Sequence, residues 1–137
     1  MLNLCFLFLG LQYAEGIFTG SNARCVALLK ALKEVVQDYT TPVNSELSRD
    51  FNDKLKPQIT YLKECRPLSV SMGNAIRFLK SKINAIPSGT PDEQAKDILK
   101  ETIDEYIHHN IELAAEQISI TACEKIRDGD VILTYGW

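Results

Sequence analysis

Four side chains in the second half of the chain have the residue types and spacing of a metal site. They are Glu105, His108, His109 and Glu112. Residues three and four positions apart share one face of a helix, and imidazole and carboxylate groups are common zinc ligands. A metal site also needs a ligand from a second element, and the sequence offers no clear candidate. We therefore expect a solvated helix face here and no metal site.

Two further features have the form of a reactive site. Cys25 follows Arg24, and a neighbouring cation can activate a thiol, but Cys25 falls in the apolar phase of a helix, which indicates burial. Gly16 and Gly20 precede the same helix, as the glycines of a phosphate-binding loop do. Neither of the glycine-rich nucleotide-binding motifs is present, however. We predict no catalytic residue and no cofactor.

The elements that must position these groups are helices, and the longest is expected over about 91–126. Thr90 can cap it, Pro91 suits its first position and Glu93 completes a capping box. Apolar residues then recur every three or four positions without an internal glycine or proline: Ala95, Ile98, Leu99, Ile103, Tyr106, Ile107, Ile111, Ala114, Ala115, Ile118, Ala122 and Ile126. A helix of this length, about 50 Å, must pack its stripe against several others.

Shorter helices are expected before the long one. The first ends near Glu15, and the second begins at Ser21 or Asn22. The third contains Pro57, which should kink or split it, and the fourth covers about 70–86. The predicted fold is therefore mainly α, a helical bundle built around one long helix.

The last ten residues have a different character. After an Asp-Gly-Asp turn, the run from Val131 to Tyr135 is almost continuously apolar, which is typical of a strand buried on both faces. A lone strand has nothing to pair with. We therefore predict a helical domain over 1–127 and, over 128–137, the first strand of an α/β domain of which the rest is absent. A strand that closes against the helices is the alternative.

Composition and charge narrow the possible functions. The 137 residues are 45% hydrophobic and 24% charged, which is ordinary for a globular domain. The net charge of -3 argues against a general nucleic-acid binder, because such a protein needs a basic surface. The four cysteines form no C-x-x-C pair, so they indicate neither a zinc module nor a dense disulfide framework. They suit a cytosolic protein with free thiols.

The first eleven residues, MLNLCFLFLGL, resemble the apolar core of a signal peptide. The positive segment of a signal peptide is missing, since the first cation in the chain is Arg24. The run is also shorter than the roughly 20 residues that a membrane span needs. We interpret residues 1–8 as an atypical start and the whole segment as a first core helix. A small secreted helical protein is the alternative.

Several short segments carry a resemblance to a known family. They are Leu9-Gly-Leu-Gln-Tyr13, Gly20-Ser-Asn-Ala-Arg-Cys25, Val36-Gln-Asp-Tyr-Thr-Thr-Pro42, Glu46-Leu-Ser-Arg-Asp50, Cys65-Arg-Pro-Leu-Ser69, Gly129-Asp-Val-Ile-Leu133 and Tyr135-Gly136. In these segments the chain resembles the delta-subunit family of eukaryotic translation initiation factor 2B, the guanine-nucleotide exchange factor for initiation factor 2. Ordered matches along most of a chain are more specific than one short motif.

The resemblance implies a fold and a role. The family's regulatory subunits have an N-terminal helical domain followed by a Rossmann-like α/β domain, so the strand at 131–135 would be the first of that domain. They are cytosolic and non-catalytic, and they form a decamer core from alpha, beta and delta subunits, with gamma and epsilon subunits for the exchange chemistry. The resemblance implies no cofactor, no direct contact with nucleic acid and no membrane association.

The resemblance also implies a binding site for a protein partner. In this family the helical domains line a cleft that receives the phosphorylated alpha subunit of initiation factor 2, a step of the integrated stress response. Arg49 matches the family's cleft arginine, and Leu113 matches its leucine before Ala114-Ala115. His109 falls where a relative carries glutamate. The alternative is that Arg49 is an ordinary solvated arginine and Leu113 a core residue.

A second family-level function remains open. Aldose–ketose isomerases for methylthioribose phosphate and ribose bisphosphate share the family fold. Their catalytic residues lie in the α/β domain. If the chain were related to these isomerases, we would expect it to be inactive without that domain.

Overall fold

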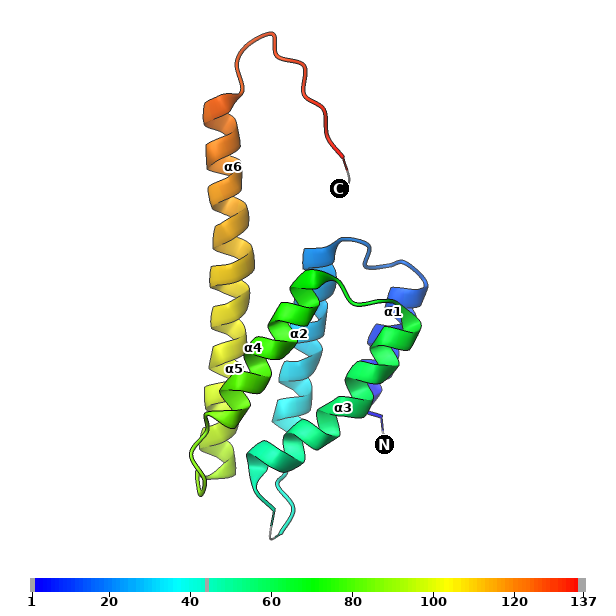
Figure 1. Ribbon diagram of the computed structural model, residues 1–137, viewed down its shortest axis with the longest axis vertical. Coiled ribbons are helices and arrows are strands. Elements are labelled where there is room, and N and C mark those ends of the chain that lie inside the picture. Colours follow the sequence, from blue (N-terminus) through cyan, green and yellow to red (C-terminus); the bar gives the residue numbers. More distant parts are fainter. Residues whose placement is uncertain (1, 44, 136–137) are drawn as a thin grey trace.

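The computed structural model describes residues 2–43 and 45–135. Met1, Gly136 and Trp137, which belong to the predicted atypical start and the predicted strand segment, lie outside the described residues. The helices are α1 (Leu4–Ala14), α2 (Ser21–Asp38), α3 (Leu47–Cys65), α4 (Val70–Asn84), α5 (Asp92–Ile107), the π-helical turn η1 (His108–Glu112) and α6 (Leu113–Lys125). Since α5, η1 and α6 follow one another without a break, they form one long helix (Figure 1). The predicted helical bundle around a long helix is confirmed.

The core lies around α2, which packs against α1, α4 and α5. Leu28, Leu29 and Leu32 of α2 are at most 1% exposed. They are spaced by one, three and four positions, so they cover a broad stripe that can face several neighbours at once. α3 lies against α1 and α4 and closes the bundle on the other side (Figure 1).

The N-terminal helix α1 is a core helix, as one interpretation of the apolar start predicted. Asn3 caps it, because its Oδ1 accepts a hydrogen bond of 2.8 Å from the backbone N–H of Cys5. Phe6 and Tyr13 are completely buried, whereas the opposite side of the helix is exposed at Phe8. Gly10 faces α3 so closely that a methyl group added to it would lie 2.5 Å from Tyr61 Cε1.

Pro57 does not split α3. The helix runs without interruption from Leu47 to Cys65, although Pro57 can donate no hydrogen bond to the preceding turn. Buried residues lie on both sides of it, with Leu55 1% and Leu62 0% exposed. Packing of both halves against the same core compensates for the missing bond. Of the two predicted effects of Pro57, a kink or a split, the split does not occur.

The start of the long helix differs from the predicted capping box. α5 begins at Asp92 with Pro91 as its N-cap and without a side-chain cap. The Thr90 hydroxyl donates instead to the Pro87 carbonyl at 2.7 Å, and Asp92 Oδ2 accepts a hydrogen bond of 2.9 Å from the backbone N–H of Thr41. Thr90 and Asp92, which the local sequence pattern placed at the helix cap, therefore form hydrogen bonds within and between loops instead.

The apolar stripe of the long helix is buried only along its first half. Leu99 and Ile103 are 2% and 1% exposed, but no residue from 113 to 135 is buried. In Figure 1, α6 extends beyond the rest of the bundle. The predicted stripe is present in the sequence up to Ile126, but its second half finds no neighbour among the described residues.

The strand predicted over 131–135 is not formed, and no strand occurs in the described parts of the chain. Val131, Leu133 and Tyr135 are 98%, 95% and 103% exposed. A strand forms by pairing with another strand, and residues 2–43 and 45–135 offer none. The division into domains at residue 127 stays a prediction. No helix in the described ranges is both long and apolar enough to cross a membrane.

Candidate partner-binding surface

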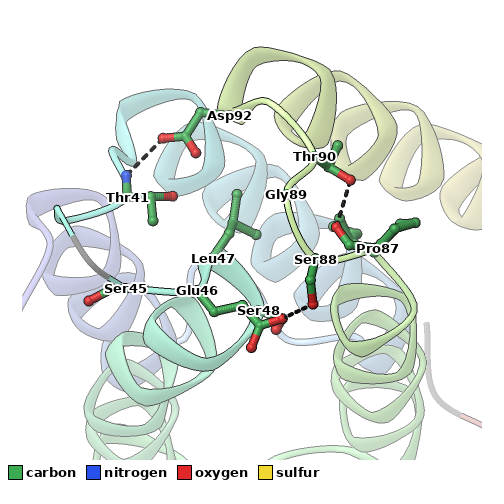
Figure 2. Close-up of a pocket in the computed structure, with 11 residues that line it drawn as sticks. Thr41, Ser45, Glu46, Leu47, Ser48, Pro87, Ser88, Gly89, Thr90 and Asp92 are labelled. Carbon is green, nitrogen blue, oxygen red and sulfur yellow. Dashed lines mark hydrogen bonds between the residues drawn. The ribbon is translucent and has the colours of Figure 1, made fainter.

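A polar cavity of about 140 Å³ lies at the N-terminal end of α3, between the α2–α3 and α4–α5 loops (Figure 2). Its walls are mostly hydroxyl and carboxylate side chains. The lining residues are Thr41, Ser45, Glu46, Leu47, Ser48, Ile86, Pro87, Ser88, Gly89, Thr90 and Asp92. The Ser88 hydroxyl donates a hydrogen bond to the Glu46 carboxylate, so the α4–α5 loop is tied to the start of α3.

A second contact fixes the α2–α3 loop. The backbone N–H of Thr41 donates to Asp92 Oδ2 at the start of α5. This hydrogen bond is the main cause that lowers the pKa of Asp92 below its usual value. Together the two contacts join both loops to helix starts and hold the first turn of α3 in place.

Next to this cavity lies an open groove of about 420 Å³ that contains Arg49. It shares Ser45 and Glu46 with the cavity and is also lined by Asp50 and Asp53. Arg49 is exposed and forms no ion pair or hydrogen bond with the described residues. The guanidinium group is thus free to bind a carboxylate or a carbonyl oxygen from outside the chain.

Asp50, beside Arg49, is already paired on its other side. The Tyr39 hydroxyl donates to Asp50 Oδ2 at 2.6 Å, and Lys54 Nζ lies 3.0 Å from the same oxygen. The hydrogen bond from Tyr39 is the main cause that lowers the pKa of Asp50. Lys54 also lies 4.7 Å from the centre of the Tyr39 ring. Asp50 makes no ion pair with Arg49, since consecutive residues of a helix do not face each other.

The other two predicted site residues lie along the long helix. His109 is exposed, and its Nδ1 is 3.0 Å from the backbone carbonyl oxygen of Glu105. Leu113 is 39% exposed, so it is not the core residue of the alternative prediction. At 1.5 Å per residue, these positions are roughly 25 to 30 Å along the helix from Asp92, which lies near Arg49's end of the bundle. The structure therefore brings His109 and Leu113 together but not Arg49.

The three side chains form an extended exposed surface and no common pocket. Such a surface suits a folded protein partner, which can contact points far apart. It cannot hold one small ligand between all three residues. Whether these residues bind a partner stays a prediction.

The four predicted candidates for metal chemistry lie on the exposed part of the long helix. His108 Nδ1 is 3.1 Å from Glu112 Oε2, and His109 contacts a backbone carbonyl oxygen. Within the described residues no group of three potential ligands could hold a metal ion. All four side chains are exposed.

Sequence reasoning missed a buried cluster around Arg24. Arg24 is only 6% exposed, and its Nη2 donates to the Pro67 carbonyl at 2.6 Å. The Tyr13 hydroxyl donates to the Arg24 carbonyl at 2.5 Å. Burial raises the pKa of the neighbouring Cys25 thiol, which opposes its activation. The spacing of Arg24 and Leu28 by one helical turn was the signal that placed Arg24 on the buried face.

Comparison with known proteins adds a family model and two kinds of relatives. The model described as "Initiation factor 2 subunit family" matches residues 18–137. The chain is 50% identical over 127 residues to translation initiation factor eIF2B subunit delta of Schizosaccharomyces pombe, which covers 93% of this chain and 27% of that protein. It is 42% identical over 127 residues to the corresponding protein of Dictyostelium discoideum, covering 93% of this chain and 20% of that protein.

A ribose 1,5-bisphosphate isomerase is also similar. The protein from Thermococcus kodakarensis is 38% identical over 104 residues, which covers 71% of this chain and 32% of the isomerase. The chain therefore spans about a third or less of the length of each of these curated relatives.

Two solved structures match the fold. The crystal structure of eIF2B delta from Chaetomium thermophilum superposes with a TM-score of 0.90 at 42% identity and covers 94% of this chain and 48% of that one. A chain of the tetrameric eIF2B-beta2-delta2 complex from the same organism gives a TM-score of 0.90 at 42% identity, with 95% and 42% covered.

Proposed function

Because this chain belongs to the initiation factor 2 subunit family, we propose that it serves as a non-catalytic regulatory part of the guanine-nucleotide exchange factor for translation initiation factor 2. Its similarity to eIF2B delta subunits in both sequence and fold supports a regulatory subunit of eIF2B. In this proposal the chain acts without a catalytic residue or cofactor of its own. Its role is to present helical surfaces to other proteins.

The proposed partners inside the complex are the alpha, beta, gamma and epsilon subunits. A delta subunit that is 42% identical to this chain occurs in a solved complex whose printed description names beta and delta, which supports a hetero-oligomer. The proposed location is the cytosol, without membrane or direct nucleic-acid contact. All four cysteines have free thiols, which is the state that a reducing compartment maintains.

The proposed partner outside the complex is the phosphorylated alpha subunit of initiation factor 2. The observation that carries this proposal is the exposed guanidinium group of Arg49, which lies in an open groove and pairs with none of residues 2–43 and 45–135. Leu113 and His109 add an apolar and a polar contact point on the long helix. Cations and apolar side chains at exposed sites are typical of protein interfaces.

Binding of the alpha subunit, phosphorylated or not, to this chain together with the other subunits tests the proposal. The double variant Arg49→Ala with Leu113→Ala should weaken phosphate-dependent binding by about tenfold. The control is Arg77→Ala with Ile98→Ala, since Ile98 is 40% exposed and Leu113 39%. Unchanged binding by the first pair, or an equal loss with both pairs, would contradict the proposed site.

An isomerase acting on a sugar phosphate is the second candidate, favoured by the 38% identity to a ribose 1,5-bisphosphate isomerase. We expect the chain to show no conversion of ribose 1,5-bisphosphate or methylthioribose 1-phosphate. The control is an intact isomerase assayed under the same conditions. Turnover above background by the purified chain would favour the enzyme and count against a purely regulatory role.

A further inference from the structure

Arg49 lies in the first turn of α3, and this turn has no side-chain cap of its own. α3 begins at Leu47, and Glu46 at its N-cap makes no capping hydrogen bond through its carboxylate within the described residues. The first four backbone N–H groups of a helix have no partner inside the helix, so a first turn without a cap is weakly held. The position of Arg49 therefore depends on contacts from outside α3.

The contact that holds this turn comes from the α4–α5 loop. The Ser88 hydroxyl donates a hydrogen bond to the Glu46 carboxylate, across 42 residues of sequence (Figure 2). A second link runs from the backbone N–H of Thr41 to Asp92 Oδ2. Thr41 and Glu46 stand at the two ends of the segment that leads into α3. Both ends of that segment are thus bonded to the segment that joins α4 to α5.

The α4–α5 loop presents Ser88 in a fixed conformation. Residues Pro87 to Thr90 form a β-turn, which is closed by a hydrogen bond of 3.2 Å from the Thr90 backbone N–H to the Pro87 carbonyl. Gly89 has a φ of 85°, the positive value that the third position of a type II turn requires. Glycine adopts this φ without steric strain. Ser88, at the second position, is therefore held in place by the turn.

The same loop joins the two distant parts of the proposed partner surface. α3 carries Arg49 and packs against α1 and α4, whereas α5, the first part of the helix that carries Leu113, packs against α2 and α4. The hydrogen bonds of Ser88 and Asp92 run directly from the start of the long helix and its preceding loop to α3 and the loop before it. They therefore set where Arg49 lies relative to the long helix.

We propose that Ser88 is a positioning residue that holds the first turn of α3, and with it Arg49, in the place where the guanidinium group meets a protein partner. The inference rests on the proposed binding of the phosphorylated alpha subunit of initiation factor 2 at Arg49. Ser88 acts through Glu46 and needs no contact of its own with that partner.

Hydrogen exchange tests this role without the partner. The backbone N–H of Asp50 donates to the Glu46 carbonyl at 3.0 Å, so exchange at Asp50 reports on the first turn of α3. We expect Ser88→Ala to speed this exchange about two- to tenfold, the range that loss of one hydrogen bond gives. Ser88→Thr keeps a hydroxyl and should exchange like the wild type. The matched control is Thr90→Ala, because that hydroxyl bonds within the turn, whose backbone bond remains.

Binding of the phosphorylated alpha subunit, with the other subunits present, tests the consequence. Ser88→Ala should weaken binding about two- to tenfold when Arg49 is present. It should cause no further loss in an Arg49→Ala chain, because residues that act through one another do not contribute additively. Gly89→Ala should also weaken binding, since alanine is strained at a positive φ. Gly89→Asn should weaken it less, because asparagine tolerates that conformation.

Three results would overturn the inference. They are unchanged exchange at Asp50 in Ser88→Ala, an equal effect of Thr90→Ala, and additive losses of binding from Ser88→Ala and Arg49→Ala. Failure of the proposed function gives a different result, which is that Arg49→Ala alone leaves binding unchanged. In that case the proposed binding site would be wrong, and exchange at Asp50 would decide by itself whether Ser88 holds the first turn of α3.

Discussion

Because α1 and α3 approach closely, we expect replacement of a helical glycine by alanine to destabilise the chain, which is the opposite of the usual effect. In the interior of a helix, Gly→Ala normally stabilises by about 0.5 to 1 kcal/mol, because glycine loses more conformational entropy on folding. At Gly10, however, the added methyl group would lie 2.5 Å from Tyr61 Cε1 and 2.8 Å from Cys65 Sγ. Carbon atoms prefer a separation of about 3.5 to 4.0 Å, so Gly10→Ala should force the two helices or the Tyr61 ring apart.

The expected size of the effect follows from two opposing contributions. Overpacking of this kind costs about 1 to 3 kcal/mol, and the entropic gain offsets up to about 1 kcal/mol of it. We therefore expect Gly10→Ala to lower the free energy of unfolding by up to about 2.5 kcal/mol. Urea denaturation followed by circular dichroism measures this difference as a lower midpoint with an unchanged m-value.

Gly73 in α4 provides the matched control. It is also a helical glycine, but nothing lies within 4 Å of a methyl group added to it. Gly73→Ala should therefore stabilise the chain by about 0.5 to 1 kcal/mol. In a background that carries both Tyr61→Ala and Cys65→Ala, Gly10→Ala should lose most of its cost, because both of the closest neighbours are gone. If Gly10→Ala were as stabilising as Gly73→Ala, the tight contact between α1 and α3 would be refuted.

Three further predictions concern single side chains. The pKa of Asp92 is lowered in the folded chain, so its hydrogen bond to Thr41 stabilises the chain above the ordinary carboxyl pKa of about 3.9. This contribution is lost as the pH falls through the lower folded value. Asp92→Ala should therefore make the free energy of unfolding fall less steeply at acid pH, and an unchanged slope would contradict this. Arg24→Met should lower the free energy of unfolding by about 1.5 to 3 kcal/mol, measured by thermal unfolding, because it removes a charged hydrogen bond of 2.6 Å to the Pro67 carbonyl. An unchanged stability would show that the buried guanidinium group makes no net contribution. Cys123 is exposed, so a thiol reagent should modify it before the other three cysteines, and faster labelling of any of those would contradict the burial pattern.

The helices of the bundle could be predicted from the sequence because periodicity directly reports which side chains share a face. The apolar spacing located the described α-helices but not the π-helical turn η1, and burial of Leu99 and Ile103 followed from their phase. The details at helix ends could not be predicted in the same way. The start of the long helix depends on Thr41, which is 51 residues away from its partner Asp92, and no local motif contains that information.

The predicted site shows a similar division. Resemblance to a family supplied Arg49, His109 and Leu113, whereas the apolar stripe read from periodicity does not include Leu113. Leu113 is 39% exposed, and it is the first residue of α6, which extends beyond the rest of the described bundle (Figure 1). Asp50 is held by Tyr39 and Lys54, whereas its neighbour Arg49 pairs with none of the described residues. The contact between Tyr39 and Asp50 joins two helices, so it is a property of the folded chain.

The π-helical turn η1 changes the direction in which the side chains of α6 face, relative to those of α5. A π turn contains one residue more than the α-helical turn it replaces, and one residue corresponds to about 100° of rotation around the axis. Everything after His108–Glu112 is therefore turned by that angle relative to an uninterrupted α-helix. The direction in which the side chains of α6 point around the helix axis is thus set by the one extra residue in the π turn, and not by the composition of α6 itself. Gain or loss of one residue in this turn would redirect the whole outer surface while the packing of α5 stayed the same.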